Sequence, residues 1–174
     1  MSTQTLETNV IGTDVSLEFD APWATYWIVF LRIVTGYWMM HAGLTKLLEG
    51  GFSAGWWLTG ATQGTIVGPV TVWFGQNAPW FVNAAIPIGE FLIGLGVLVG
   101  GFTRLAAFFG AFLMFFFYFG NAEWTHGFVN GDLMGLLLFL TMIVFGAGRV
   151  WGLDRYLEDT EIVKKHNRLR YLLG

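Results

Sequence analysis

The sequence contains no cysteine among its 174 residues, and only 12% of its residues are charged. Without cysteine the chain can form neither a disulfide nor a thiolate-bound metal or iron-sulfur centre. A net charge of −3 argues against nucleic acid as a partner, because nucleic-acid binding needs a basic face. The first 22 residues contain no Lys or Arg and no continuous apolar core, so they do not resemble a cleavable signal peptide. We also find no internal repeat.

The few charged residues are unevenly distributed, with none from position 50 to 89 and none from 133 to 148. Hydrophobic residues make up 55% of the chain, aromatic residues make up 18%, and the mean hydropathy is +0.57. This hydrophobic content exceeds what soluble domains usually carry, so part of the apolar surface must face lipid. We therefore predict an all-α integral membrane protein.

Four segments are apolar enough to be membrane spans, since a helix rises ~1.5 Å per residue and the hydrocarbon core of a bilayer is ~30 Å thick. They cover residues 23–48, 81–102, 105–120 and 133–150. Residues 51–80 are rich in Gly, Trp and Thr but are interrupted by Gly68, Pro69 and Pro79, so we expect an interfacial or re-entrant segment there. Its tryptophans either anchor it among the headgroups or stack on a ligand. The predicted architecture is a four-transmembrane-helix bundle with this Trp/Gly-rich segment between the first two helices.

The basic residues predict the orientation of this bundle. Seven of the nine fall on one side of the membrane if both termini are cytoplasmic, as the positive-inside rule expects. These seven are Arg104, Arg149, Arg155, Lys164, Lys165, Arg168 and Arg170. We divide the chain into a polar N-terminal tail (1–22), a domain in the cell membrane (23–151) and an amphipathic basic C-terminal segment (152–174). That last segment either lies along the cytoplasmic membrane surface or docks on a partner protein.

Ionisable residues inside the predicted spans are candidates for function, because charge in a membrane interior is costly. At about 100° per residue, one stripe of the first span gathers charged and small residues within ~40° of Arg32. The stripe consists of Arg32, Gly36, Met39, Gly43 and Lys46. Small residues let helices approach closely, so we expect the stripe to face the bundle and His41, on the opposite side, to face away. Lys46 either extends its ammonium to the membrane interface or takes part in function.

The second span carries a similar stripe around Glu90. Four residues lie within about 40° of it, namely Asn83, Gly94, Gly101 and Arg104. Measured from the cytoplasmic ends of their spans, Arg32 and Glu90 lie at similar depths, ~14 Å and ~18 Å. We therefore predict an ion pair between Arg32 and Glu90. The pair either fixes the register of the two helices or handles a proton or ligand directly.

The loop between the third and fourth spans concentrates polar residues at the outer side. It contains Glu123, His126, Asn130 and Asp132 within twelve positions. These residue types can bind a metal, move protons or hold an anion, but they also serve for loop solvation and helix capping, here by Asn130 or Asp132. We take Glu123, His126 and Asp132 as candidate substrate-binding residues and assign no metal site, since the spacing matches no ligand motif.

An ordered set of short motifs resembles the DoxX/DoxD family of small four-helix membrane proteins over residues 26–157. The first span contributes Arg32, Gly36 and the run His41-Ala42-Gly43-Leu44-Thr45-Lys46. The second contributes Glu90, Gly94-Leu95-Gly96 and the following Gly101-Phe102-Thr103-Arg104. The closing motif is Phe145-Gly146-Ala147-Gly148-Arg149, followed by Leu153-Asp154. The Trp-rich insertion is similar to that of the DoxD branch.

The resemblance implies a redox role, because the DoxD branch is the small membrane subunit of thiosulfate:quinone oxidoreductase. It implies quinone as the membrane electron acceptor and a second oxidoreductase subunit as partner, although the sequence itself shows no cofactor motif. The candidate catalytic residues are then Arg32, Glu90, His41 and Lys46. The competing hypotheses are a non-enzymatic membrane anchor or scaffold for a partner protein and, third, a small-solute transporter. Membrane lipid and further copies of the chain are the other expected partners.

Overall fold

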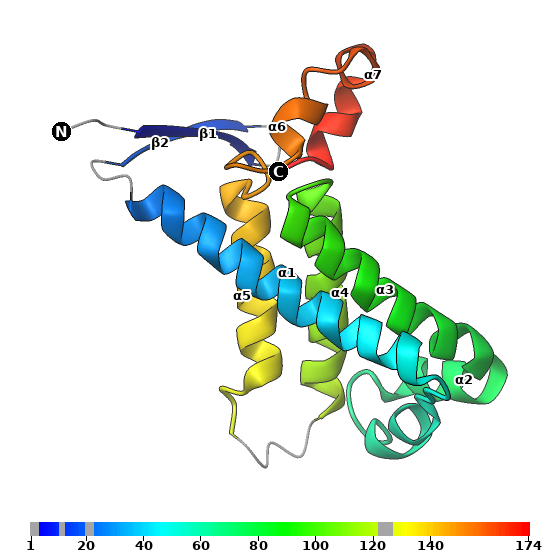
Figure 1. Cartoon of the computed structure of the whole chain (residues 1–174). Coiled ribbons are helices and arrows are strands. Elements are labelled where there is room, and N and C mark those ends of the chain that lie inside the picture. Colours follow the sequence, from blue (N-terminus) through cyan, green and yellow to red (C-terminus); the bar gives the residue numbers. More distant parts are fainter. Residues whose placement is uncertain (1–3, 11–12, 20–22, 122–126) are drawn as a thin grey trace.

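The computed structural model describes residues 4–10, 13–19, 23–121 and 127–174, and this part of the chain is helical apart from one β-hairpin (Figure 1). The hairpin consists of β1 (Gln4–Val10) and β2 (Thr13–Phe19). The long helices are α1 (Trp23–Glu49), α3 (Pro79–Val99), α4 (Thr103–Gly120) and α5 (Gly131–Phe145). The shorter elements are a π-helix (Trp57–Ala61), α2 (Gly68–Asn77), α6 (Asp154–Leu157), α7 (Glu161–Lys165) and a 3-10 helix (Asn167–Tyr171).

The hairpin lies where the sequence led us to expect only a polar tail. Its strands pair antiparallel, from Gln4 opposite Phe19 to Val10 opposite Thr13. Composition shows that this stretch is polar, but strand pairing depends on a period of two in the side-chain pattern and on β-branched residues. The all-α expectation therefore holds for the rest of the described chain and fails for the hairpin.

The long helices begin and end at local signals that the sequence contains. Pro79 occupies the first turn of α3, where its missing N–H costs no hydrogen bond, and Gly100 ends the helix in the left-handed region at φ 70°. The side chain of Asn130 accepts a hydrogen bond from the backbone N–H of Leu133 and caps α5, so the expected cap is confirmed at Asn130. Gly146 ends α5 with φ 57°.

The bundle is built from two antiparallel helix pairs, α1 with α3 and α4 with α5 (Figure 1). In the first pair the backbones approach closely at glycines: Gly36 lies against Leu98, Gly43 against Phe91, and Gly94 against the backbone of Met40. A Cβ at any of these glycines would collide with the facing helix. The prediction that the small-residue stripe of the first span faces the bundle is confirmed. Large apolar side chains such as Phe139 and Met142 fill the core between the pairs.

By length and composition, two helices in the described part of the chain could cross a membrane, α3 and α4, and α5 is a shorter apolar helix. Helix α1 has 27 residues, but its ionisable side chains lower its hydropathy. The described chain therefore supports membrane-spanning helices, while the complete four-span bundle stays a prediction. The observed bounds of the four long helices differ from the predicted spans by two to five residues at most ends, because fraying and capping are decided locally.

The segment between α1 and α3 is folded rather than extended, and it contains the π-helix and α2. It is held by the buried hydroxyls of Thr62 and Thr71, which are 2.6 Å apart, and by Trp57, whose ring packs edge-on against Phe117 of α4. Trp56 and Trp80 remain largely exposed. As expected, the segment is no fifth span, and whether it is interfacial or re-entrant stays a prediction.

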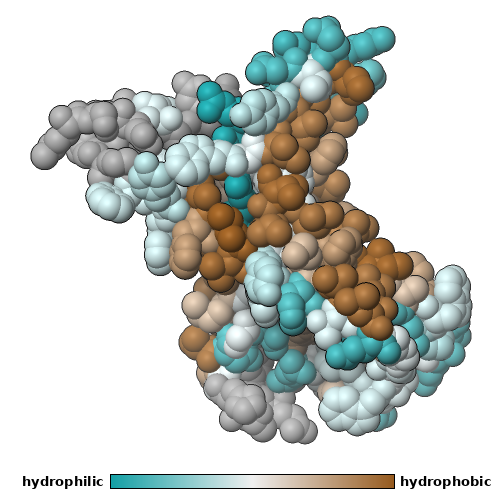
Figure 2. Space-filling model, in the orientation of Figure 1, coloured by the Kyte–Doolittle hydropathy of each residue, from teal (hydrophilic) through white to brown (hydrophobic). Residues whose placement is uncertain are grey.

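The outer surface carries an apolar belt (Figure 2). Large apolar side chains are exposed along α1, α3 and α4, including Phe30, Leu92, Phe108 and Phe112. The hairpin and the C-terminal segment lie together at one end of the bundle, and the π-helix and α2 lie at the other (Figure 1). Exposed apolar surface on this scale marks contact with a nonaqueous phase.

Candidate functional site: the Lys46–Glu90 ion pair

The ion pair inside the bundle joins Lys46 of α1 to Glu90 of α3. The Lys46 ammonium donates to both carboxylate oxygens, at 2.6 Å for Oε1 and at closer range for Oε2. The Glu90 side chain is only 3% exposed, whereas that of Lys46 is 30% exposed. The carboxylate is therefore enclosed by protein, and the ammonium is the part of the pair that can be reached from outside.

Glycine packing brings these two side chains to the same level. Gly43 lies directly against the backbone of α3 between Pro87 and Phe91. Gly43 is therefore level with Glu90, and Lys46, about one turn further along α1, reaches back to the carboxylate with its long side chain. The pair thus depends on the close backbone approach at Gly43.

The loop that follows α1 folds back beside the pair. The ammonium nitrogen of Lys46 lies 5.4 Å from the centre of the Phe52 ring, a cation–π contact. The backbone N–H of Ala54 donates to Asn83 Oδ1 of α3 at 2.8 Å, which fastens this loop about two turns from Glu90. An aromatic ring and an ammonium therefore form the accessible edge of the site.

The predicted ion pair between Arg32 and Glu90 is wrong. The Arg32 guanidinium instead donates to three backbone carbonyls beyond the end of α5, those of Ala147 (2.8 Å), Val150 (2.7 Å) and Trp151 (3.1 Å). These carbonyls lie beyond the regular hydrogen bonds of the helix. The buried guanidinium has several N–H donors and supplies their hydrogen bonds.

The error came from the assumption that the start of α1 and the end of α3 lie at the same level. In the structure Arg32 lies beside Gly100, just past the end of α3. Ten residues of helix separate Gly100 from Glu90, a rise of about 15 Å, which an arginine side chain cannot span. The first turns of α1 therefore extend beyond α3, and only the packing register shows this.

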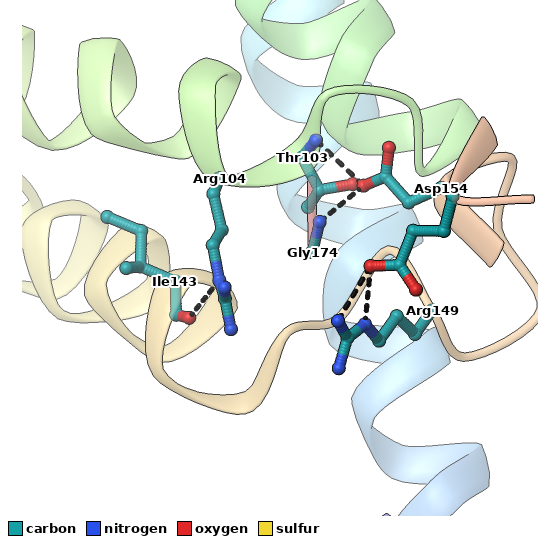
Figure 3. Close-up of polar contacts among 7 residues, drawn as sticks. Thr103, Arg104, Ile143, Arg149, Asp154 and Gly174 are labelled. Carbon is teal, nitrogen blue, oxygen red and sulfur yellow. Dashed lines mark hydrogen bonds and ion pairs between the residues drawn. The ribbon is translucent and has the colours of Figure 1, made fainter. Parts of the chain in front are cut away.

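Other residues of the family-like motifs meet at the same end of the bundle as Arg32 (Figure 3). The fully buried carboxylate of Asp154 accepts hydrogen bonds from the backbone N–H groups of Phe102 (2.6 Å), Thr103 (2.9 Å) and Gly174 (2.8 Å). Gly148 lies so close to this carboxylate that it has no room for a Cβ. In the sequence, Asp154 stands out only as part of the closing motif, as an acidic residue that follows a glycine-rich stretch.

Two arginines complete this end of the bundle (Figure 3). Arg104 Nε donates to the carbonyl of Ile143 on α5 at 3.2 Å. Arg149 forms an ion pair with Glu158, with Nε at 2.9 Å and Nη2 at 2.6 Å from Oε1. Arg32 and Arg104 thus join α1 and α4 to the end of α5 and the turn after it, while Asp154 and the Arg149–Glu158 pair hold the C-terminal segment. We assign these four residues to the architecture of this end rather than to chemistry.

The structure describes only part of the predicted outer pocket. Glu123 and His126 lie outside the described residues, so their substrate-binding role stays a prediction. Asp132 is described, and its Oδ2 accepts a hydrogen bond from Asn121 Nδ2 at 2.9 Å. Asn121 Oδ1 in turn accepts from the Trp57 indole at 3.4 Å, so Asp132 is linked to the π-helix segment.

His41 lies away from the Lys46–Glu90 pair, as its predicted position on the opposite face of the helix requires. It is exposed on the outer side of α1, with its ring 5.7 Å from that of Tyr37. The two rings and Ile33, Val34 and Trp38 line an open groove of about 360 Å³. The structure therefore brings together Lys46 and Glu90, and leaves Arg32 and His41 in separate environments.

Within the described ranges, no three His, Asp or Glu side chains lie close enough together to hold a metal ion. The chemistry available at the Lys46–Glu90 site is that of an acid and a base already in contact. An ammonium can release a proton to a bound group, and the neighbouring carboxylate stabilises the charged form of the lysine and can accept a proton. Both roles suit a site that exchanges protons in a dry environment.

The apolar belt, the helix pairs and the buried ion pair define a helical membrane protein. The family model for DoxX matches residues 27–122, from the first turns of α1 to the end of α4. Since this match covers more than half of the chain, the protein belongs to the DoxX family, a membrane protein family. No curated protein and no solved structure matches the chain.

Proposed function

We propose that this protein is a membrane subunit of a quinone-linked oxidoreductase, resembling the small subunit of thiosulfate:quinone oxidoreductase. The observation that carries the proposal is the Lys46–Glu90 pair: a carboxylate 3% exposed and an ammonium 30% exposed, between two helices of an apolar bundle. Ionisable groups inside a membrane domain mark proton, ion or substrate pathways more often than they serve stability alone.

The stoichiometry of the reaction explains why such a pair is needed. Reduction of a quinone to a quinol consumes two electrons and two protons, whereas oxidative coupling of two thiosulfate ions releases two electrons and no proton. The protons must therefore come from water. In our proposal the Lys46 ammonium donates one proton to the quinone oxygen being reduced, and the neutral amine then takes up a proton from water beside the Glu90 carboxylate. The recharged ammonium donates the second proton, so two protons from water end on the quinol.

The electrons come from a second subunit in this proposal. The chain has no cysteine, so a thiolate-bound redox centre would have to lie on that partner. The sulfur anion would bind toward the end of the bundle that carries Asp132 and, in the sequence, Glu123 and His126. Quinone is the membrane acceptor, and both it and the second subunit are expected from the resemblance to the DoxD branch.

We further propose a multi-pass topology with both termini in the cytoplasm. The N-terminal hairpin and the C-terminal segment share one end of the bundle (Figure 1), and this end also carries Arg104, Arg149 and the exposed basic residues of 152–174. A cytoplasmic position of this end satisfies the positive-inside rule.

The test is quinone reduction by the protein purified together with its partner subunit. With thiosulfate as donor, the absorbance change of a short-chain quinone should report turnover. Lys46→Met and Glu90→Gln should each lower kcat at least about a hundredfold, the lower end of the range for a lost general acid or base. Arg149→Met, which breaks an ion pair at the other end, is the matched control and should keep kcat. Absence of reduction with thiosulfate and with other sulfur donors would refute the proposed function.

A scaffold or membrane anchor is the second candidate, and a separate observation favours it. Arg32 donates to three backbone carbonyls just before the C-terminal segment, and Asp154 accepts from three backbone N–H groups, so this segment is held against the bundle as a folded cap. A folded cap is a suitable platform for a partner protein. If no protein co-purifies under mild solubilisation, this candidate loses its basis, and co-purification without any turnover would favour it over the enzyme subunit.

A further inference from the structure

The C-terminal segment, residues 152–174, is a folded cap rather than a loose tail. Val163 and Leu173 are buried, the backbone N–H of Leu105 donates to the carbonyl of Leu172 at 3.2 Å, and Asp154 accepts three backbone hydrogen bonds. The side chains on its outside are therefore held in fixed places relative to the bundle. The fold therefore determines where the charged residues of the cap lie.

Half of the acidic side chains of the cap already have partners within the protein. The carboxylate of Asp154 is fully buried among backbone N–H groups, and Glu158 is paired with Arg149. Asp159 lies at 4.0 Å from Lys164, the limit of an ion pair. Among the acidic residues of the cap, Glu161 has no ion-pair partner in the described part of the chain.

The basic side chains of the cap are left on its surface. The exposed ones without an ion-pair partner among the described residues are Arg155, Lys165, Arg168 and Arg170. Large apolar side chains are exposed between them, with Tyr156 at 73%, Ile162 at 69% and Tyr171 at 56%. Fixed cations interleaved with exposed apolar groups form a surface that suits both a phosphate and an acyl chain.

The position of the cap beside the apolar belt favours a lipid headgroup over a soluble anion as its partner. Figure 2 shows hydrophilic residues over α7, next to the apolar surface of the bundle. If the belt is surrounded by acyl chains, the headgroups of the same leaflet lie at the level of the cap. A soluble anion would meet the cations but leave Tyr156 and Ile162 in water.

We propose that the cap binds the headgroups of anionic phospholipids through Arg155, Lys165, Arg168 and Arg170. The proposal does not depend on quinone chemistry; it needs only that the belt lies in a bilayer. It implies a shell of anionic lipid around this end of the protein, with the negative headgroup charge balancing the surplus positive charge of the cap.

The experiment measures lipid selectivity next to the cap. A single Tyr156→Cys in the cysteine-free chain carries a donor dye, and energy transfer to acceptor-labelled phosphatidylglycerol or phosphatidylcholine is compared in otherwise identical nanodiscs. Each basic residue near a membrane surface contributes enough to enrich anionic lipid severalfold, so we expect a roughly five- to tenfold preference for phosphatidylglycerol at low salt. Salt should reduce it, because exposed charges are screened.

Replacement of the four cations by Gln should reduce the preference to about one. The matched control adds the same negative charge at the opposite end by four exposed substitutions, Thr59→Glu, Gln63→Glu, Gln76→Glu and Asn77→Glu, and should keep the preference. Circular dichroism of both variants establishes that the helices persist; a single Lys165→Gln, which should lose part of the preference, replaces the fourfold variant if that variant unfolds.

Three outcomes would overturn the proposal. Equal energy transfer to the two lipids in the unmodified cap would show that it has no lipid preference. Loss of the preference with inorganic phosphate, but not with chloride of equal ionic strength, would identify a free anion as the ligand. Loss of a co-purifying protein in the fourfold variant, with unchanged lipid selectivity, would identify the cap as a protein-docking surface. None of these outcomes bears on quinone reduction, so the proposed function is tested separately.

Discussion

Disruption of the Lys46–Glu90 pair should destabilise the protein asymmetrically, because its two members differ in exposure. Lys46→Met leaves a carboxylate that is 3% exposed without its partner, whereas Glu90→Gln leaves an ammonium that is 30% exposed. The freed lysine can extend toward the interface, but the freed carboxylate cannot leave the helix interface. The lysine substitution should therefore be the more damaging one.

The magnitude follows from the cost of an uncompensated buried charge. Removal of one partner of a buried pair typically costs ~3–5 kcal/mol, and we expect Lys46→Met to lie in this range. Glu90→Gln should cost about 1–3 kcal/mol, since a neutral amide still accepts a hydrogen bond and the lysine can be solvated. For a chain of this size, 1 kcal/mol corresponds to roughly 2–4 °C in Tm. Lys46→Met should lower Tm by about 10 °C and Glu90→Gln by about 5 °C.

The assay is thermal unfolding in detergent, applied to both single variants and the double variant. The double variant should be more stable than Lys46→Met alone, since no charge is then left buried, and the cycle should give a coupling of at least ~1 kcal/mol. Arg149→Met is the control, because its pair is partly exposed and should be worth about 1 kcal/mol or less. Equal losses in the two single variants, a larger loss for Glu90→Gln, or no coupling would refute the reasoning.

Three further perturbations test other parts of the structure. Gly94→Ala places a Cβ against the backbone of α1 and should lower the free energy of unfolding by about 1–3 kcal/mol or more. Gly89→Ala is the control, because nothing lies within 4 Å of its new Cβ, and it should cause no such loss. Thermal unfolding of the two variants measures the difference. Asp154→Ala removes the acceptor of three backbone N–H groups, so limited proteolysis should cleave the C-terminal segment faster than in the parent protein. Single cysteines should react with an impermeant reagent from outside at Gln76 and not at Lys164, and the reverse pattern would contradict cytoplasmic termini.

Local features of the fold could be predicted from the sequence because they depend on neighbouring residues. The long helices follow from apolar segments, and the outward position of His41 and the inward stripe through Gly36 and Gly43 follow from helical periodicity. The cap at Asn130 follows from the side-chain chemistry of the residue directly before the helix. These predictions need no knowledge of what each helix packs against.

The ion pairing was decided only by the tertiary structure. Periodicity placed Arg32, Lys46 and Glu90 on inward faces, but it contains no information on how far one helix slides along another. Close contacts at Gly43 and Gly94 set that register, bringing Lys46 level with Glu90 and leaving Arg32 beyond the end of α3. The two pairings differ by a slide of about 15 Å along the helix, the rise of the ten residues between Glu90 and Gly100.

The hairpin and the C-terminal cap were also decided only by the tertiary structure. Pairing of β1 with β2 and burial of Asp154 among backbone N–H groups of α4 and Gly174 join segments whose contacts are not encoded in a helical or compositional pattern. The sequence by itself determined which segments are helical and which faces are apolar, because these are properties of local side chains. The tertiary structure determined which charges meet, because a partner is chosen by three-dimensional packing and by the need of each buried polar group for a hydrogen bond.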